Sequence, residues 1–282
     1  MKPIIKWAGG KKKLAPLISK AFGGPCRGTY YEPFLGSASV FLHRLAHNEL
    51  GWSTLSDSNG SLIWFYRCLV NDYSEFETEF LKLPRENTPE NYRRVQREYN
   101  AEFPSVQYSA ARFLWLNKAC YNGLYRENAS GQHNVPRGSR AIIQITNPEE
   151  LRAFGACFKE AKLEACSFEI PMKCAYGDGE GQDQVYCDPP YVPRSNRGFT
   201  AYQGSGFGFG EQRKLAKACI EAANRGAFVV LSNHDLPVVT EDLYPSKDGF
   251  QVFDRPMVGR SIGRGTREPV REVILTIGER IS

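Results

Sequence analysis

Residues 28–57, GTYYEPFLGSASVFLHRLAHNELGWSTLSD, contain the pattern that decides the fold. The segment 28–34 predicts a strand that ends at a turn of small residues, and 37–50 predicts a helix with an apolar face. A second short strand, 51–55, runs into Ser56 and Asp57. A strand, a small-residue turn, a helix, a second strand and an acid about 20 residues after the turn are typical of a nucleotide-binding α/β unit.

The same alternation of strands and helices returns in the second half of the chain, after a central segment of different composition. The pattern there predicts helices at 149–158 and 211–224 and strands at 162–166, 184–187, 227–231 and 271–277. The middle is rich in Glu, Arg, Tyr and Phe, with helical periodicity at 62–71, 73–83, 89–101 and 109–120, and a loop at 121–140. We therefore predict an α/β domain in two parts, 1–59 and 145–282, separated by a helical domain at 60–144.

Composition excludes several classes of protein. Apolar residues make up 41% and charged residues 24% of the 282 positions, which is ordinary for a globular protein and unlike a disordered chain, a collagen or a coiled-coil rod. No run approaches the roughly 18 apolar residues of a membrane span. The N-terminal lysines are not followed by the apolar segment of a secretory signal. We therefore expect a cytoplasmic protein with no membrane partner.

Charge and cysteine usage narrow the class further. Lys and Arg outnumber Asp and Glu by 36 to 31, and the net charge of +5 is compatible with a nucleic-acid partner without requiring one. A Gly- and Arg-rich segment, 255–271, is typical of a mobile basic loop. The eight cysteines form no C-x-x-C pair, and no Cys/His cluster has zinc-site spacing. We expect reduced thiols and no metal.

The sharpest motif, Asp188-Pro189-Pro190-Tyr191, follows the predicted strand 184–187. The end of such a strand faces the ligand crevice of an open α/β sheet. Asp offers an acceptor, the prolines remove N–H donors and fix the chain, and Tyr offers a flat face. These groups suit an exocyclic amino group on an aromatic ring, although a Pro-Pro turn after a strand is also a common chain reversal.

Three further segments are candidates for binding, and each also has an ordinary structural interpretation. The turn 32–39 lets the backbone approach a ligand and Asp57 suits ribose hydroxyls, although a plain turn and a helix cap are the alternatives. In the segment 6–13, Trp7 beside two glycines indicates an aromatic lid over a flat ligand, although a lysine run is more often a solvated face. The segment 117–138 interleaves aromatics with Arg and Asn, which suits DNA, although a surface loop is the commoner explanation.

Together the motifs resemble one family. K-W-A-G-G-K, E-P-F-x-G-x-x-S-V-F, an acid after the next strand, Y-N-G-L-x-R-x-N, N-V-P-x-G, C-D-P-P-Y and S-N-H-D occur in this order. From Lys6 to Ile277 the chain is similar to Dam-type DNA adenine N6-methyltransferases, which use S-adenosylmethionine. The resemblance implies a Rossmann-like sheet of seven strands whose last hairpin is antiparallel, and an inserted helical target-recognition domain. It also implies double-stranded DNA as partner and GATC as target.

The resemblance further implies roles for individual side chains. Contacts to the methyl donor fall on Trp7, Lys11, Phe34, Asp57, Phe168 and Asp188, with the two phenylalanines on either side of its adenine. Contacts to DNA fall on Lys6, Tyr121, Asn122, Leu124, Arg126 and Pro136, with Arg126 recognising a guanine and Arg137 as the next candidate. The target adenine is flipped out, stacks on Tyr191 and donates its two N6–H bonds to Asp188 and the Pro189 carbonyl. No covalent cysteine step and no metal are implied.

The chain departs from the family pattern at three places, and two other functions stay open. Ala38 stands where the family usually has a second glycine, extra Gly and acidic residues at 177–183 suggest a surface loop, and the basic loop near 261–266 is shorter than in relatives. A methyltransferase for RNA or for cytosine N4 is opposed by the recognition loop and by Asp188, where cytosine N4 enzymes more often have Ser. A catalytically dead DNA-binding module is opposed by the intact D-P-P-Y. The sequence does not address oligomeric state, and we expect a monomer.

Overall fold

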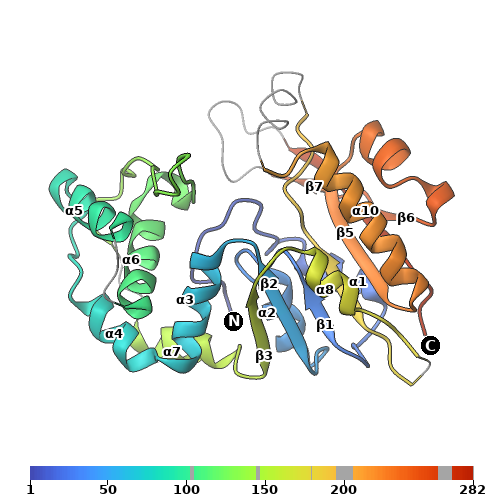
Figure 1. Cartoon of the computed structure of the whole chain (residues 1–282), viewed down its shortest axis with the longest axis horizontal. Helices are drawn as coiled ribbons and strands as arrows, with labels where there is room; N and C mark the ends of the chain where they lie inside the picture. Colours follow the sequence, from blue (N-terminus) through green and yellow to red (C-terminus); the bar gives the residue numbers. More distant parts are fainter. Residues whose placement is uncertain (102–104, 144–146, 179, 195–205, 260–268, 282) are drawn as a thin grey trace.

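A computed structural model describes the chain apart from residues 102–104, 144–146, 179, 195–205, 260–268 and 282. The basic loop expected near 261–266 therefore lies outside the described residues. Within the described part, one sheet forms the centre of the fold (Figure 1). Its strands are β1 (Tyr30–Glu32), β2 (Ser53–Asp57), β3 (Ala161–Ala165), β4 (Gln184–Cys187), β5 (Phe228–His234), β6 (Gln251–Asp254), β7 (Met257–Val258) and β8 (Val270–Ile277).

The order of the strands places a ligand crevice at the middle of the sheet. The path is β3-β2-β1-β4-β5-β8-β6, and the two-residue β7 pairs with the start of β8. The first five strands of this path are parallel, and β8 runs antiparallel to β5 and β6. The strand order reverses between β1 and β4, and ligands of open α/β sheets bind outside the carboxyl ends of strands at such a point.

Helices cover both faces of the sheet and form a separate group at one side of it (Figure 1). They are α1 (Ala15–Phe22), α2 (Ser39–Ala46), α3 (Gly60–Asn71), α4 (Tyr73–Leu81), α5 (Pro89–Asn100), α6 (Val106–Ala119), α7 (Pro148–Ala156), α8 (Glu169–Cys174) and α10 (Phe209–Asn224). In β4, Tyr186 belongs to the apolar cluster shared with α1 and α2, whereas Val185 and Cys187 belong to the cluster shared with α8 and α10. Alternate residues of the strand thus bury opposite faces of the sheet.

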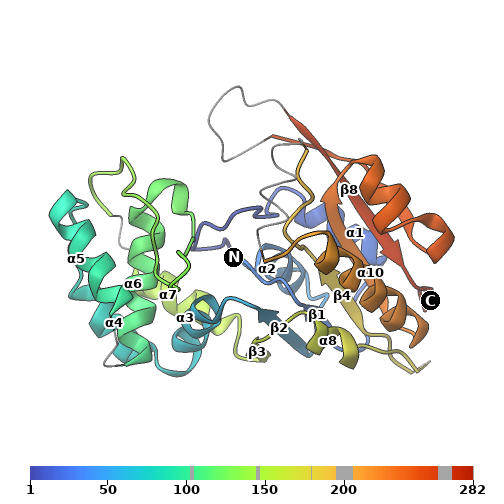
Figure 2. The same ribbon diagram turned by 45° about the horizontal axis from the view of Figure 1, so that its top comes forward.

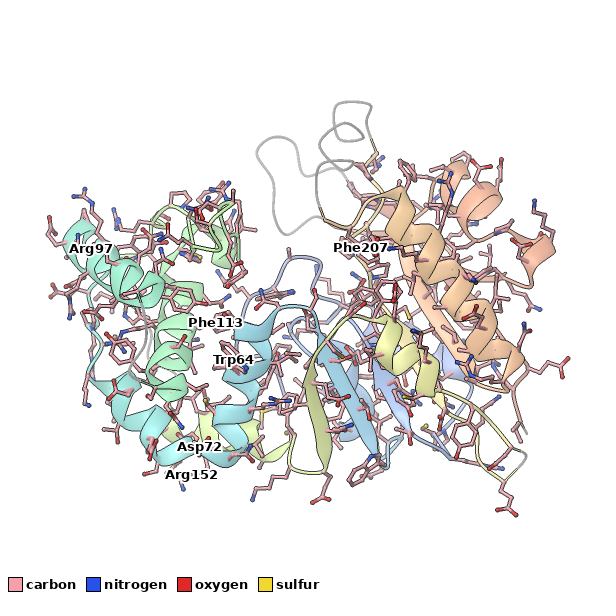
Figure 3. The ribbon with its side chains drawn as sticks, in the orientation of Figure 1. Trp64, Asp72, Arg97, Phe113, Arg152 and Phe207 are labelled. Carbon is pink, nitrogen blue, oxygen red and sulfur yellow. The ribbon has the colours of Figure 1, made fainter. Side chains whose placement is uncertain are left out.

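The helical group packs around α6, and several of its helices begin at a side-chain N-cap. Asn59, Thr88 and Ser105 accept backbone N–H bonds at the starts of α3, α5 and α6, as N-caps do. Helices α3, α4 and α5 all pack against α6, and α3 also packs against β2 and β3. Phe113 of α6 is labelled in Figure 3, and its ring centroid lies 5.5 Å from that of Phe65 in α3. One apolar cluster therefore continues from the sheet into this group, and a division at residues 60 and 144 stays a prediction.

The α/β class expected from the sequence is confirmed, with a few elements that the sequence patterns do not predict. Helices α1 and α8 and strands β6 and β7 are absent from the predicted set. β6 lies at the sheet edge with three of its four residues exposed, so no apolar alternation marks it. None of the described helices combines the length and the apolar character needed to cross a bilayer.

Candidate active site and nucleic-acid interface

Asp188 directly follows β4 and meets a lysine from the N-terminal segment at the crevice. Its Oδ1 lies 3.0 Å from Lys11 Nζ, and its side chain keeps 18% of its surface exposed. Lys11 is buried and also donates to the Gly9 carbonyl at 2.6 Å. Burial raises the pKa of Asp188 to about 6, and the Lys11 ammonium acts in the opposite direction. At neutral pH the carboxylate is therefore ionised and able to accept hydrogen bonds.

Tyr191 stands beside this ion pair with its ring held from three sides. The Lys11 ammonium lies over the ring, 4.5 Å from its centroid. The hydroxyl donates to Glu272 Oε2 at 2.8 Å, and the His234 ring packs edge-on at 5.0 Å. The same ammonium thus contacts the two groups that are predicted to hold the amine and the ring of the target base. A base that uses both groups has to displace Lys11.

Asp57, at the end of β2, is bonded to the turn that follows β1. Its Oδ2 accepts from the Gly36 N–H at 3.0 Å and its Oδ1 from the Asn59 N–H at 2.9 Å. Burial raises the pKa of Asp57, and these two N–H donors act against that shift. The N-cap of α3 is Asn59, so the interpretation of Asp57 as the helix cap is wrong. Asp57 instead fixes the small-residue turn at the crevice.

The turn itself contains two residues in the left-handed region, Gly36 (φ +48°) and Ala38 (φ +57°). A Cβ atom at Gly36 would lie 2.8 Å from Cδ1 of Trp7, so this contact requires glycine. The left-handed conformation of Ala38 carries a steric cost of about 1 kcal/mol, because alanine has a Cβ atom. The departure from the family pattern at Ala38 is therefore a strained backbone position at the start of α2.

Three phenylalanines gather where the donor's adenine is predicted to bind. The rings of Phe34 and Phe168 stack directly, with centroids 5.5 Å apart and planes at 24°. Phe207, which precedes α10, packs edge-on against both, with centroids 5.6 and 5.8 Å away (Figure 3). A ring held between two others needs them about 7 Å apart, because each contact takes about 3.5 Å. The predicted sandwich therefore requires Phe34 and Phe168 to separate, and Phe207 is an aromatic neighbour that no motif indicated.

Trp7 bridges the sheet and the helical group, along the N-terminal segment that runs between them (Figure 2). Its ring stacks on Tyr125 with centroids 5.8 Å apart, and it contacts Phe113 at 6.3 Å. The neighbouring Lys6 donates its N–H to Asn117 Oδ1 at 2.9 Å, and Asn117 Nδ2 donates back to the Lys6 carbonyl at 2.7 Å. These contacts fasten the segment to α6. A contact of Trp7 with the methyl donor stays a prediction.

The predicted DNA contacts lie together on a hairpin at one end of the helical group. Isolated bridges from Cys120 to Arg137 and from Glu127 to His133 define this hairpin, residues 120–137. Tyr121, Arg126 and Pro136 are exposed, and Asn122 and Leu124 are half-buried. Arg126 donates from Nε to Asn134 Oδ1 at 2.6 Å and from a terminal nitrogen to the Asn134 carbonyl at 3.0 Å. Lys6 is exposed on the N-terminal segment, and its backbone contact with Asn117 places it beside the hairpin.

A groove lies between the hairpin and α5, and the arginines Arg93 and Arg137 are among the residues that line it. Its volume is about 480 Å³, and the residues that line it include Arg93, His133, Asn134, Pro136 and Arg137. Arg137 also donates to the Asn87 carbonyl at 2.7 Å, so its side chain is partly committed within the protein. The groove is a candidate surface for the phosphate backbone of a nucleic acid.

Two further ionisable groups near the crevice have shifted pKa values. Burial raises the pKa of Glu32, at the end of β1, to about 8, although the Tyr30 hydroxyl donates to it at 2.8 Å. Burial likewise raises the pKa of the Cys187 thiol well above its usual value. A protonated, buried thiol is a poor nucleophile. The absence of a covalent cysteine step stays a prediction.

Known proteins match the chain over most of its length. Residues 7–255 match the model of the family described as D12 class N6 adenine-specific DNA methyltransferase. The chain is 34% identical to the type II methyltransferase M.MjaIII of Methanocaldococcus jannaschii, over 83% of this chain and 84% of that protein. It is 32% identical to a DNA adenine methylase of Haemophilus influenzae, over 99% and 94% of the two chains. A DNA adenine methylase of Escherichia coli K12 is 33% identical, over 96% and 93%.

Proposed function

The chain belongs to the D12 class of N6 adenine-specific DNA methyltransferases, and we propose that it methylates the adenine of GATC in duplex DNA after flipping that base out of the helix. The methyl donor is S-adenosylmethionine. We expect the enzyme to act as a monomer on DNA in the cytoplasm. Relatives that are named DNA adenine methylases support the choice of substrate.

One observation carries the catalytic part of the proposal: a nitrogen that bears N–H bonds fits between Asp188 and Tyr191. The Lys11 ammonium lies 3.0 Å from the carboxylate and over the tyrosine ring. The N6 amino group of an adenine stacked on Tyr191 would meet the same acceptor. Asp188 and the Pro189 carbonyl would then accept the two N6–H bonds, which draws the nitrogen lone pair out of conjugation with the ring.

The reaction needs little more from the protein than these fixed acceptors. The bound donor supplies an electrophilic methyl group on a sulfonium centre. The N6 nitrogen would gain that methyl group as its bond to the donor's sulfur breaks, and it would lose one proton. Asp188 is the carboxylate placed to accept that proton and to pass it to solvent. Positioning and preorganised acceptors supply most of the lowering of such a barrier.

Several residues of the crevice are proposed to hold the methyl donor. Asp57 offers a carboxylate to ribose hydroxyls at the end of β2, beside a turn where Gly36 keeps the backbone open. Phe34 and Phe168 would offer apolar faces to an adenine once they separate, and Phe207 lies edge-on against both rings. Lys11, once it leaves Asp188, is a cation available to the donor's carboxylate. The absence of a dinucleotide-type glycine run agrees with a ligand that has no pyrophosphate.

Recognition of the target is assigned to the hairpin 120–137 together with Lys6. Arg126 is proposed to hold a guanine through its O6 and N7 atoms, which requires it to exchange its bonds to Asn134 for bonds to the base. Tyr121, Asn122, Leu124 and Pro136 are proposed to contact the DNA around the target. Extrusion of the base costs a few kcal/mol, which these contacts offset.

The test is to incubate the purified protein with S-adenosylmethionine and a plasmid of known sequence, and then to identify and map the methylated base. We expect N6-methyladenine at GATC and nowhere else. N4-methylcytosine in the product, or methylation of RNA in place of the plasmid, would replace the proposal with one of the two alternative methyltransferase activities. Binding of DNA without any methylation would indicate a catalytically dead module.

A further inference from the structure

Two buried side-chain amides, Gln212 of α10 and Asn233 of β5, hold the backbone on either side of Tyr191. Gln212 Nε2 donates to the Pro190 carbonyl at 2.8 Å, and Asn233 Oδ1 accepts from the Val192 N–H at 3.1 Å. Both side chains are 0% exposed. The D-P-P-Y strap, Asp188–Val192, is therefore anchored at the carbonyl before Tyr191 and at the N–H after it.

The amides are themselves fixed in orientation. Asn233 Nδ2 donates to Gln212 Oε1 at 3.3 Å, and the Tyr244 hydroxyl donates to the same oxygen at 2.5 Å. Asn233 Oδ1 also accepts from the His234 N–H at 2.9 Å. A rotated Gln212 amide would set its oxygen against the Pro190 carbonyl and its nitrogen against the Asn233 amide nitrogen. The network therefore has one satisfied arrangement.

His234 adds contacts to the Val192 carbonyl and to the ring of Tyr191. Its Nδ1 lies 2.6 Å from the Val192 carbonyl and, because a carbonyl only accepts, this nitrogen carries the hydrogen. Its ring packs edge-on against Tyr191. The peptide groups on either side of Tyr191 and its ring are therefore in contact with side chains of α10 and β5.

The sequence of the strap explains why such anchors are needed. Pro189 and Pro190 have no backbone N–H, so the strap lacks two of the donors through which a chain is normally tied to a sheet. Its first donors after Asp188 belong to Tyr191 and Val192. Anchoring therefore has to come through carbonyls and through the Val192 N–H, which are the groups that the two amides and His234 hold.

We propose that Gln212 and Asn233 are positioning residues for methyl transfer. They set the directions of the peptide groups around Tyr191, and through the rigid prolines they set the Pro189 carbonyl and Asp188 as a pair of acceptors. This inference rests on the proposed function, because the acceptors matter only if a base amine binds there. Loss of either amide lowers the rate of the chemical step and leaves the binding of donor and DNA in place.

A second buried glutamine provides a matched control. Gln182 lies two residues before β4, at the end of that strand opposite the strap, and is 7% exposed. Its side chain also makes three hydrogen bonds, to the carbonyls of Gly226 and Glu279 at 2.8 and 2.6 Å and from the Ile281 N–H at 3.1 Å. Gln182→Met and Gln212→Met therefore remove similar side chains, each with three hydrogen bonds among the described residues, and only Gln212 touches the strap.

The experiment measures kcat, KM for donor and DNA, and thermal stability for the wild type, Gln212→Met and Gln182→Met. Both variants should lose stability, and only Gln212→Met should lose at least about tenfold in kcat at unchanged KM, because a misplaced reacting group costs up to about a hundredfold. Equal kcat values for the two folded variants would overturn the inference and leave the proposed function standing. A wild type that forms no N6-methyladenine would instead overturn the proposed function.

Asn233→Ala is a second, independent test, and its new side chain is smaller than the one it replaces. It removes the partner of the Val192 N–H and should lower kcat at least about tenfold at unchanged KM, on the same grounds. A wild-type kcat in folded Asn233→Ala would contradict the inference even if Gln212→Met failed to fold.

Discussion

The D-P-P-Y strap and the hairpin 120–137 differ in how their functional side chains are held. Tyr191 is held by Glu272, and the backbone on either side of it is anchored by Gln212 and Asn233, which belong to other elements. Arg126 is exposed, and its described hydrogen bonds go to Asn134 of the same hairpin. Chemistry requires acceptors that do not move, whereas recognition requires side chains that exchange internal bonds for bonds to DNA. Substitutions in the strap should therefore change rate, and substitutions in the hairpin should change selectivity.

The largest expected effect is that of Asp188→Ala. The variant loses an acceptor for the N6 amine, and removal of one preorganised polar group costs at least about 10²-fold in kcat. Its affinity for DNA should change little, because the hairpin is untouched. Single-turnover methylation together with a DNA-binding titration measures both quantities. Near-normal methylation would remove Asp188 from the chemistry.

The acid limb of the pH profile should depend on Asp188 in the strap and not on residues of the hairpin. Asp188 accepts only when it is ionised, so kcat/KM should fall roughly tenfold per pH unit below its pKa of about 6. Because the Lys11 ammonium opposes the rise in that pKa, Lys11→Met should move the acid limb to higher pH. Arg126→Ala is the control and should leave the limb in place. A limb that does not move in Lys11→Met would show that another group titrates.

A smaller effect is expected at Asp57, which serves donor binding. Asp57→Ala removes a carboxylate proposed to hold ribose hydroxyls, and a hydrogen bond to a charged group contributes about 1.5–3 kcal/mol. The loss should appear as a higher Kd for S-adenosylmethionine in calorimetry, with DNA affinity unchanged. A Kd equal to that of the wild type would leave Asp57 with only its bonds to the Gly36 and Asn59 N–H groups.

The sequence predicts the local parts of this arrangement and misses the contacts between distant ones. A strand followed by an acid, or by a D-P-P-Y run, is a local pattern, and it predicts the positions of Asp57 and Asp188 at strand ends. The contact of Lys11 with Asp188 and Tyr191 depends on how the N-terminal segment crosses the sheet, which no local pattern contains. Glu272 is simply one charged residue within a predicted strand until pairing brings it to Tyr191.

Two aromatic residues show the same limit. The glycines beside Trp7 indicate a lid over a flat ligand, whereas the structure packs its ring against Tyr125 and against Phe113 of α6. Phe207 carries no motif, yet it lies against both Phe34 and Phe168. Their positions follow from tertiary packing between segments far apart in sequence, which periodicity cannot supply.

The division between strap and hairpin is tested most directly by the specificity of Arg126→Ala. A bidentate contact to guanine is worth about 1–3 kcal/mol of discrimination. The measurement is kcat/KM of the wild type, Arg126→Ala and Asp188→Ala on GATC and on sites with one base replaced. We predict that Arg126→Ala has a smaller ratio of kcat/KM on GATC to kcat/KM on a site changed at a guanine-bearing position. Asp188→Ala should lower kcat/KM on all sites and leave that ratio unchanged. A uniform loss across all sites in Arg126→Ala would contradict the account, because Arg126 would then contact only the DNA backbone.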